Sequence, residues 1–291
     1  ERKWRSGLHQ SVEIREDVPL TPERDIEARI TRQRYFGFYE TVSGMTGTAT
    51  GNETELMEFY DLPVVEIPRN EPSNRVRQPS RYFKDEESKF SAIALETAER
   101  HRAGQPVLVG TRTISQSKEI ASRLSAENVP HTLLNGTQDE PEASLIAHAG
   151  VYGAVMIATN MAGRGTDIRL DDKARRAGGL HVIVSEHHDS KRVDRQLIGR
   201  AARQAEPGSY RFFVSAEDDI IARFEPSLGK AIATSASSNG ECRKSFDREI
   251  RRLQLRIEKL SYATRKKLVV HDNWLESVQK TVASRTAKTE N

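Results

Sequence analysis

The sequence predicts an α/β fold: a parallel sheet flanked by helices, with an irregular N-terminal segment before it and one long helix after it. From residue 82 onward, short apolar runs typical of buried strands alternate with stretches of helical periodicity, the pattern of βαβ units. The apolar runs at 106–109, 155–158 and 180–184 each give way to polar residues. Since parallel strands end at one edge of the sheet, where open α/β sheets bind ligands, these loops predict a ligand site.

Composition shifts divide the chain into five segments. The prolines and polar residues of 68–79 indicate a domain linker, and the Ser, Ala and Gly of 228–245 indicate a second one. The sheet is expected between them, at 80–227. Beyond the second linker, apolar residues at alternating spacings of four and three predict a helix with a packing seam: Phe246, Ile250, Leu253, Ile257 and Leu260. We therefore expect segments at 1–67, 68–79, 80–227, 228–245 and 246–291.

Composition excludes several classes of protein. With 291 residues, 30% of them charged, and a mean hydropathy of −0.65, the chain has the composition of a soluble protein with a real core. No apolar run approaches the roughly 20 residues of a membrane span. The single cysteine, Cys242, excludes a disulfide framework and a cysteine-cluster metal site, and it is consistent with a reducing cytosol.

Positive charge is concentrated at the C-terminal end. Residues 241–291 hold 13 Lys and Arg against 7 Asp and Glu, although the whole chain has a net charge of only +3. A basic helix of this kind can meet nucleic acid, an acidic partner or an anionic membrane surface, or it can simply be solvated. The first residue is Glu1 and no signal-like segment follows, which predicts that the chain is a piece of a longer protein.

The candidate site begins in the loop after the strand at 155–158. Residues 158–168 read ATNMAGRGTDI, so the strand passes abruptly into a loop with two glycines, an arginine and an aspartate. These candidate ligand-binding residues are Gly163, Arg164, Gly165 and Asp167. By itself, Asp167 could equally be a helix cap.

A second group of polar residues follows the strand at 180–184. Gln196, Arg200 and Arg203 are spaced i, i+4 and i+7, which on a helix places them on one face. Two guanidiniums and an amide then converge on one point, and planar donors suit phosphate oxygens. A solvated helix face is the other interpretation of the two arginines.

Several motifs, in order along the chain, resemble the SecA preprotein translocase ATPase family. The loop ATNMAGRGTDI is similar to its signature loop, and GLHQ at 7–10, GMTGTA at 44–49 and GQPVLVGT at 104–111 are similar to further segments. The resemblance implies a RecA-like sheet, the C-terminal lobe of a superfamily-2 motor, at 80–227. It also implies that residues 1–67 are the end of a preprotein-binding insertion and the last piece of a first ATPase lobe, and that 246–291 begin a helical scaffold.

The resemblance also implies roles for the candidate residues. Arg164 and Asp167 would face ATP or ADP, and Gln196 and Arg200 would sense the γ-phosphate. Arg203 would stabilise charge in the transition state, which makes Arg200 and Arg203 the catalytic candidates. Nucleotide contacts are further expected at Gly110, Thr111, Gly163 and Gly165.

Magnesium and the phosphate-binding loop are expected from elsewhere. The chain has neither a Gly-x-x-x-x-Gly-Lys-[Ser/Thr] motif nor a paired-acid motif, so a missing first lobe would supply both, and this fragment alone would be inactive. No metal site is expected in the chain itself, because His181 lies in a strand away from the polar turn at 186–189. Partners implied by the family are the first lobe, a preprotein, a SecYEG-type channel and an anionic membrane surface. The implied location is the cytoplasm, including the periphery of the inner membrane.

Two alternatives stay open. Ala202 and Ala205 stand where the family usually has glycine, and Ile198 stands where arginine is usual, so the chain could be a degenerate regulatory or binding module without ATPase activity. A nucleic-acid helicase lobe is the third interpretation. The sequence does not favour it, because the loop sequence at 159–167 resembles that of SecA. In addition, aromatic and basic residues do not alternate as they do in base-stacking surfaces.

Overall fold

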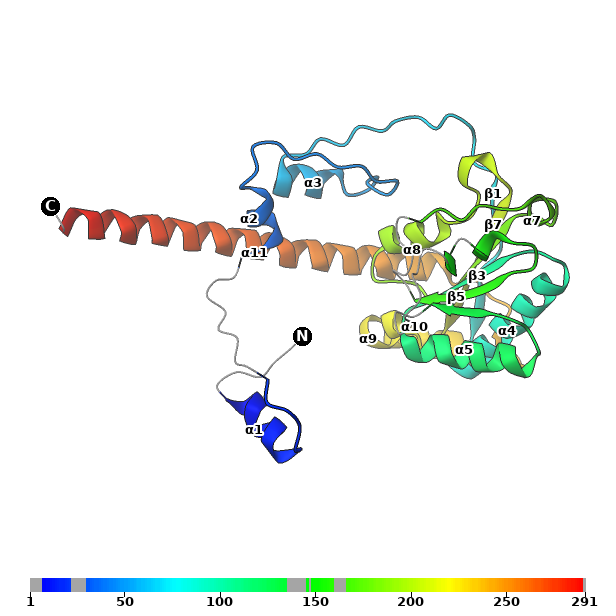
Figure 1. The fold of residues 1–291 in the computed structure, drawn as a ribbon. Coiled ribbons are helices and arrows are strands. Elements are labelled where there is room, and N and C mark those ends of the chain that lie inside the picture. Colours follow the sequence, from blue (N-terminus) through cyan, green and yellow to red (C-terminus); the bar gives the residue numbers. More distant parts are fainter. Residues whose placement is uncertain (1–6, 22–29, 135–144, 147, 160–165, 290–291) are drawn as a thin grey trace. The chain divides into compact units, whose positions relative to one another are not determined.

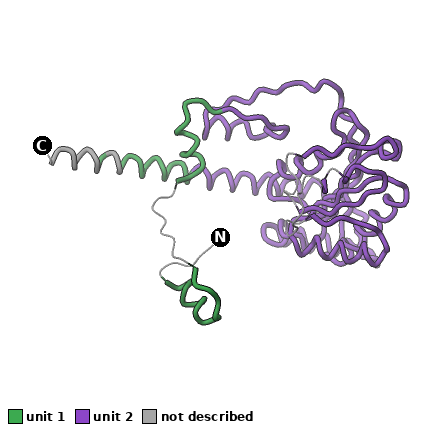
Figure 2. The backbone as a smooth tube through the Cα atoms, in the orientation of Figure 1, with its two compact units in different colours: residues 1–42, 267–291 green, residues 43–266 purple. Residues whose placement is uncertain are grey.

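The structure, a computed structural model, describes residues 7–21, 30–134, 145–146, 148–159 and 166–289. The chain forms two compact units, which are described separately. One comprises residues 43–266, and the other comprises residues 1–42 together with 267–291 (Figure 2).

The larger unit is built on one sheet of mostly parallel strands (Figure 1). Across the sheet the strands follow the order β4 (Thr132–Leu134), β5 (Val155–Thr159), β3 (Val107–Thr111), β6 (Leu180–Val184), β7 (Gly208–Ser215), β2 (Arg81–Phe83) and β8 (Glu241–Cys242). A further strand, β1 (Arg75–Arg77), also pairs with β7. All these pairings are parallel except β2 with β8. The predicted α/β fold, a largely parallel sheet flanked by helices with a long C-terminal helix, is confirmed.

Side chains alternate between the two faces of the sheet and form two apolar cores. Val107 and Val109 pack in the core that contains residues of α4 (Glu86–Arg102) and α5 (Ile114–Ala126). Leu108, between them in sequence, packs in the opposite core. That second core contains residues of α7 (Asp172–Arg176), α8 (Lys191–Ile198), α9 (Asp219–Phe224), α10 (Pro226–Thr234) and the start of α11 (Asp247–Thr289). The sheet is therefore the middle layer between two groups of helices.

The predicted seam at the start of the long helix is confirmed at four of its five positions. Phe246, Ile250, Leu253 and Ile257 are buried in the core on the α8 face of the sheet. Leu260 is 56% exposed, so the seam ends one turn earlier than predicted. The first turns of α11 are therefore part of the larger unit's core.

The prediction of a linker at 228–245 is wrong. This stretch contains most of α10 and the strand β8, in which Cys242 pairs with Tyr82. Pro226 occupies the start of α10, where its fixed φ and missing N–H suit a helix, and Leu228 and Ile232 are buried one turn apart. Small residues here serve close packing. The linker predicted at 68–79 is also partly ordered, because it contains β1.

Helix α3 (Glu53–Tyr60) lies against α11 within the same unit. The Glu55 carboxylate accepts two hydrogen bonds from Arg265, at 2.5 and 2.7 Å, and the rings of Phe59 and Tyr262 stack with centroids 5.7 Å apart. These contacts place residues 45–50, which precede α3, within the larger unit.

The smaller unit contains α1 (Leu8–Arg15), α2 (Arg32–Phe36) and the end of α11. Thr31 caps α2 by accepting a hydrogen bond from the Arg34 N–H at 3.3 Å, and its hydroxyl donates to Asp272 of α11. No helix in the described part of the chain has the length and apolar character needed to cross a membrane.

Candidate functional site

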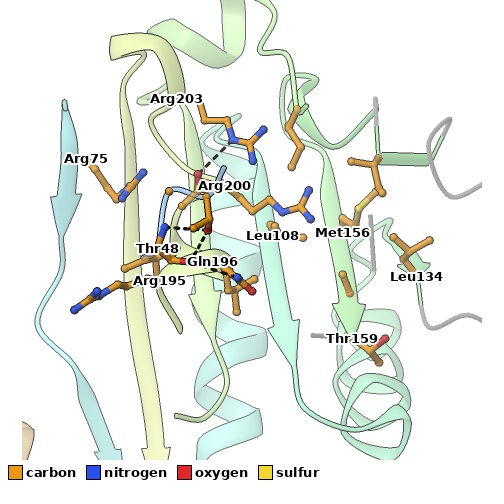
Figure 3. Close-up of a pocket in the computed structure, with 18 of the residues that line it drawn as sticks. Thr48, Arg75, Leu108, Leu134, Met156, Thr159, Arg195, Gln196, Arg200 and Arg203 are labelled. Atoms are coloured by element: carbon orange, nitrogen blue, oxygen red, sulfur yellow. Dashed lines mark hydrogen bonds between the residues drawn. The ribbon is translucent and has the colours of Figure 1, made fainter. Parts of the chain in front are cut away.

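A pocket of about 720 Å³ opens on the α8 face of the sheet (Figure 3). Its apolar floor comes from β3, β4 and β5, and its polar wall comes from α8, the segment after it, and two segments distant in sequence. The lining residues are Met45, Thr46, Gly47, Thr48, Arg69, Arg75, Leu108, Leu134, Ile146, Met156, Ala158, Thr159, Ile168, Arg195, Gln196, Leu197, Ile198, Gly199, Arg200 and Arg203. Thr159 is the last residue of β5, so the pocket reaches the carboxyl edge of the sheet, as predicted.

Helix α8 is fixed at its N-terminal end by side chains of its own and of α11. The Ser190 hydroxyl caps the helix by accepting from the Arg192 N–H at 3.3 Å, and the Glu258 carboxylate accepts from the Lys191 N–H at 2.9 Å. Carboxylates favour helix N-termini because the unpaired amides and the helix dipole are positive there. These contacts tie the start of α8 to α11.

A buried carboxylate adds a second link between the two helices. Asp194 of α8 accepts hydrogen bonds from His187 Nδ1 at 2.8 Å and His188 Nδ1 at 2.7 Å. Gln254 of α11 donates to Asp194 Oδ2 at 2.8 Å and to the His188 carbonyl at 2.9 Å. Burial by itself would raise the pKa of Asp194, but the two imidazoles outweigh it and hold the pKa well below its usual range. Asp194 therefore stays ionised and keeps α8 in place.

The predicted single helix face for Gln196, Arg200 and Arg203 is wrong. Helix α8 ends at Ile198, Gly199 caps it, and Arg203 begins a short 3₁₀ turn. The three side chains nonetheless line the same pocket, because the chain turns back on itself after the helix. In Figure 3, Arg200 and Arg203 extend from this one stretch of chain. The convergence was predicted correctly from an incorrect local structure.

The turn after α8 has an unusual backbone. Ala202, Gln204 and Ala205 adopt φ angles of 52°, 48° and 58°, the left-handed region in which a Cβ crowds the following carbonyl. Each costs roughly 1 kcal/mol or more relative to glycine. Contacts outside the turn must hold it in this shape.

Both predicted catalytic arginines contact the segment around Asp167. Arg200 donates to the Thr166 carbonyl at 3.1 Å, and Arg203 Nη1 lies 2.8 Å from Asp167 Oδ1. Burial, together with the positive charge of Arg203, lowers the pKa of Arg200, while Asp167 partly offsets this effect. The two guanidiniums are thus close enough to repel each other. An anion bound between them would offset this repulsion.

Residues 45–48 line the pocket next to α8. Gln196 Nε2 donates to the Thr48 hydroxyl at 3.4 Å, and Arg195 donates to the Thr50 carbonyl at 2.6 Å. The two labelled side chains Gln196 and Thr48 face each other in Figure 3. The GMTGTA segment therefore meets the helix that carries Gln196.

Three further arginines at the pocket were missed by sequence reasoning. Arg69 and Arg75 come from the predicted linker, and Arg195 precedes Gln196 on α8. Burial and the positive charges of Arg69 and Arg203 lower the pKa of Arg75, with a partial offset from Tyr210. A linker rich in arginine is a weak signal, since solvated linkers have the same composition.

The other predicted nucleotide contacts fall elsewhere. Gly110 and Thr111 end β3 and are buried outside the pocket lining; a Cβ at Gly110 would lie 2.3 Å from Leu197 Cδ2, so this glycine lets α8 approach the sheet. Thr111 donates to the Ala158 carbonyl at 3.4 Å. Gly163, Arg164 and Gly165 lie outside the described residues. For all five, nucleotide contact stays a prediction.

In the described part of the chain, Glu86, Glu186 and Asp218 bring carboxylate oxygens within 4.8 Å of one another. The buried Lys89 ammonium pairs with this group: its Nζ lies 2.5 Å from Asp218 Oδ1 and 3.6 Å from Glu86 Oε1. Burial and the neighbouring Asp218 charge raise the pKa of Glu186, and the positive charge of Lys89 partly offsets this rise. A lysine counter-ion accounts for the close approach of these carboxylates without a metal.

The pocket's chemistry suits a polyphosphate. Arg69, Arg75, Arg195, Arg200 and Arg203 all line it, and guanidiniums bind phosphate oxygens through paired N–H donors. Its volume lies within the range of small-molecule sites, roughly 300–1,000 Å³, and its floor of Leu108, Met156 and Leu134 is apolar. Such a site can hold a charged group against the arginines and a flat apolar group against the sheet.

Comparison with protein families gives two matches. A family model described as the SecA P-loop domain matches residues 72–176 and 171–237, more than half of the chain. A second, described as the SecA DEAD-like domain, matches residues 2–57. The first match covers every strand of the sheet except β8, together with the pocket's floor, and the second covers the segment that contains Thr48.

Curated relatives match along almost the whole chain. The protein translocase subunit SecA of Thermosipho melanesiensis is 43% identical over 286 residues, which cover 97% of this chain and 34% of that protein. That of Clostridium botulinum strain Hall is 44% identical over 275 residues, covering 94% and 33%. The chain thus spans about a third of the length of the curated relatives it matches. Among solved structures, the yeast DEAD-box splicing factor Prp28 is 21% identical, with a TM-score of 0.43 over 65% of this chain and 40% of that chain.

Proposed function

Because the chain belongs to the SecA family, we propose that it is the C-terminal motor lobe of an ATP-driven protein translocase. In this role it binds ATP between its own pocket and a first lobe, and it couples hydrolysis to preprotein movement. The observation that carries the proposal is that Gln196, Arg200 and Arg203 line one pocket, where Gln196 also contacts Thr48 of the GMTGTA segment.

In this proposal, each residue of the pocket has its own role in binding ATP. Arg200 and Arg203 meet phosphate oxygens, and Gln196 orients toward the same anion from the last turn of α8. Asp167, which pairs with Arg203 at 2.8 Å, holds that guanidinium at the pocket edge until an anion replaces the carboxylate. The apolar floor excludes water and so strengthens each charge–charge contact.

The other half of the chemistry belongs to the first lobe. ATP supplies the reactive phosphoryl group, and magnesium is held by acids that the first lobe provides. Arg203 acts across the cleft on charge that develops in the transition state, the role of an arginine finger. The fragment alone is therefore expected to bind nucleotide weakly and to hydrolyse almost none.

Partners follow from the family. A preprotein is the cargo, a SecYEG-type channel is the docking partner, and the basic end of α11 suits an anionic membrane surface at the cytoplasmic side. Nucleic acid is not proposed as a ligand.

Two measurements on the purified 291-residue chain test the proposal. A titration with a fluorescent ATP analogue should give weak binding that is lost in Arg200→Ala, and phosphate release should stay at background. Robust magnesium-dependent turnover by the chain alone, unchanged in Asp167→Ala, would refute the assignment of the missing half. Lys118→Ala, which changes an exposed charge on the opposite face of the sheet, controls for net charge.

A degenerate binding module is the second candidate, and one observation favours it. Ala202 and Ala205 occupy left-handed positions at which glycine is unstrained, so the arginine-bearing turn is less stable than it could be. If this candidate is correct, a protein that joins this chain to a P-loop lobe will bind ATP but will not turn it over.

A further inference from the structure

The turn that carries Arg203 is held by two side chains of the segment between the predicted domains. Asn74 Nδ2 donates to the Ala205 carbonyl at 2.5 Å, and Arg75 Nε donates to the Ala201 carbonyl at 3.0 Å. These two carbonyls lie at either end of the three left-handed residues. Asn74 and Arg75 thus hold the two ends of the turn through its backbone carbonyls.

The pairing of β1 with β7 fixes where these two hydrogen bonds lie. Arg75 opposes Gly208 in the parallel pairing of β1 with β7, and the sheet therefore sets the position of Asn74 and Arg75. A Cβ at Gly208 would lie 2.7 Å from the Ala202 nitrogen, so the turn packs directly on the same point of β7. The segment before β1, the strand β7 and the turn meet at one place.

The contacts of Asn74 and Arg75 matter because the backbone of the turn is strained, although Arg203 Nε also donates to the Gly199 carbonyl at 3.3 Å within it. Left-handed conformations at Ala202, Gln204 and Ala205 persist only where surrounding contacts determine them. Arg203 lies between these residues, so its direction depends on the shape of the turn. Asn74 is not among the residues that line the pocket, and its side chain contacts the turn at the Ala205 carbonyl.

From these contacts we propose that Asn74 and Arg75 are positioning residues that hold the Ala201–Ala205 turn, and with it Arg203, in the geometry that binds phosphate. The proposal rests on the proposed function, since phosphate binding at this pocket is part of it. It also gives the segment between the lobes a mechanical role: a movement of residues 68–79 relative to β7 would release the arginine.

Hydrogen exchange on the nucleotide-free 291-residue chain tests whether Asn74 and Arg75 stabilise the turn. Asn74→Ala and Arg75→Gln should each speed exchange of the amides in 199–206 by about tenfold, the change expected when one hydrogen bond is lost. Arg77→Gln is the matched control: it lies on the same strand, and its guanidinium pairs instead with Asp247 at 3.0 Å. This control should leave exchange in 199–206 unchanged.

Rescue by glycine separates positioning from a general loss of structure. Asn74→Ala should weaken binding of the fluorescent ATP analogue several-fold, and adding Ala205→Gly should restore it to within about twofold, because glycine adopts the left-handed conformation without strain. If Asn74→Ala merely destabilised the fold, the added glycine would not restore binding.

The outcomes are distinguishable. Unchanged exchange in 199–206 in both variants overturns the proposal whatever happens to nucleotide. Faster exchange with the affinity for the ATP analogue unchanged, or with affinity that glycine does not restore, overturns the link to Arg203. Faster exchange in a chain whose wild type fails to bind the ATP analogue supports the role of Asn74 and Arg75 in holding the turn and counts against the proposed function instead.

Discussion

Asp167 and Arg203 form an ion pair at the rim of the pocket, with Oδ1 and Nη1 2.8 Å apart and both side chains about two-fifths exposed. Exposed pairs of this kind contribute little to stability. On the proposed function, the pair keeps the Arg203 guanidinium in place until a phosphate replaces the carboxylate. Asp167 would then have two opposing effects on ligands: it would compete with phosphate for Arg203, and it would contact the sugar or ring of a nucleotide, as the family resemblance implies.

Asp167→Asn should change the affinities for two ligands in opposite directions. Tripolyphosphate, which has no sugar, should bind more tightly because the competing carboxylate charge is gone. ATP should bind more weakly if Asp167 contacts its ribose or ring, as the family resemblance implies. Calorimetric titration of both ligands into wild type and variant measures the two changes. Equal changes for both ligands would rule out the nucleoside contact.

A buried network on the α4 face makes stability depend on pH. His181 Nδ1 lies 2.7 Å from the Ser209 hydroxyl, and its Nε2 lies 3.4 Å from Glu96. Burial lowers the pKa of His181 to about 4, despite the nearby Glu96. Burial by itself would raise the pKa of Glu96, but His181 and the guanidiniums of Arg211 and Arg100 outweigh it and lower the pKa to about 2.

The sign follows from the depressed pKa of His181. Between its unfolded value of about 6.5 and its folded value of about 4, the unfolded chain binds more protons, so stability is lost as pH falls through this window. The loss should be about 3 kcal/mol, and Glu96 extends it below pH 4.5. Urea unfolding at pH 7, 6, 5 and 4 measures it, and His181→Gln should flatten the upper part of the curve. Parallel curves for wild type and variant would contradict the assignment.

Gly110 is expected to matter for packing. A methyl group there would meet Leu197 Cδ2 at 2.3 Å, so Gly110→Ala should destabilise the fold by about 1–3 kcal/mol through overpacking under α8. Gly47→Ala is the control, since nothing lies within 4 Å of its added Cβ. Chemical denaturation compares them, and Leu197→Ala should make the Gly110 change less costly in the double variant. Equal stability of both glycine variants would contradict this account.

The link between α8 and α11 should depend on Gln254. Gln254→Leu removes two buried hydrogen bonds and leaves the His188 carbonyl without that donor, at a cost of about 1–3 kcal/mol. Lys259→Leu, on the exposed side of the same helix, is the control. Thermal or urea unfolding gives the difference. A loss below about 0.5 kcal/mol for Gln254→Leu, the scale of ordinary surface changes, would mean that α11 does not hold α8 through this contact.

The sheet was predictable from sequence because its strands are buried on both faces. The runs at 106–109, 155–158 and 180–184 are apolar except for His181, and the structure places β3, β5 and β6 there. The seam of α11 was predictable from its periodicity. By contrast, α10 and β8 were missed because Ala, Gly and Ser occur both in linkers and in closely packed elements, and only tertiary contacts distinguish the two.

The pocket was predictable in part. Spacing along the sequence grouped Gln196, Arg200 and Arg203, and these residues do line one pocket. The path of the chain between them could not be read from spacing, because the helix stops at Ile198 and the chain continues through left-handed residues. Arg75 was missed for another reason: its position depends on β1 pairing with β7, a contact between residues more than a hundred positions apart.

The most direct test of the central claim is the turnover number of a protein that joins this chain to its P-loop lobe, with Arg203 replaced. Arg203→Ala should lower kcat by roughly 10³-fold, the scale of arginine fingers, while the affinity for ATP falls only several-fold, because most of the contact is made in the transition state. Arg203→Lys should recover little, because an ammonium lacks the planar fork of donors. If both variants keep kcat within about twofold, a barrier change of only about 0.4 kcal/mol, Arg203 is a surface residue and the chain is not the finger-bearing lobe of a motor.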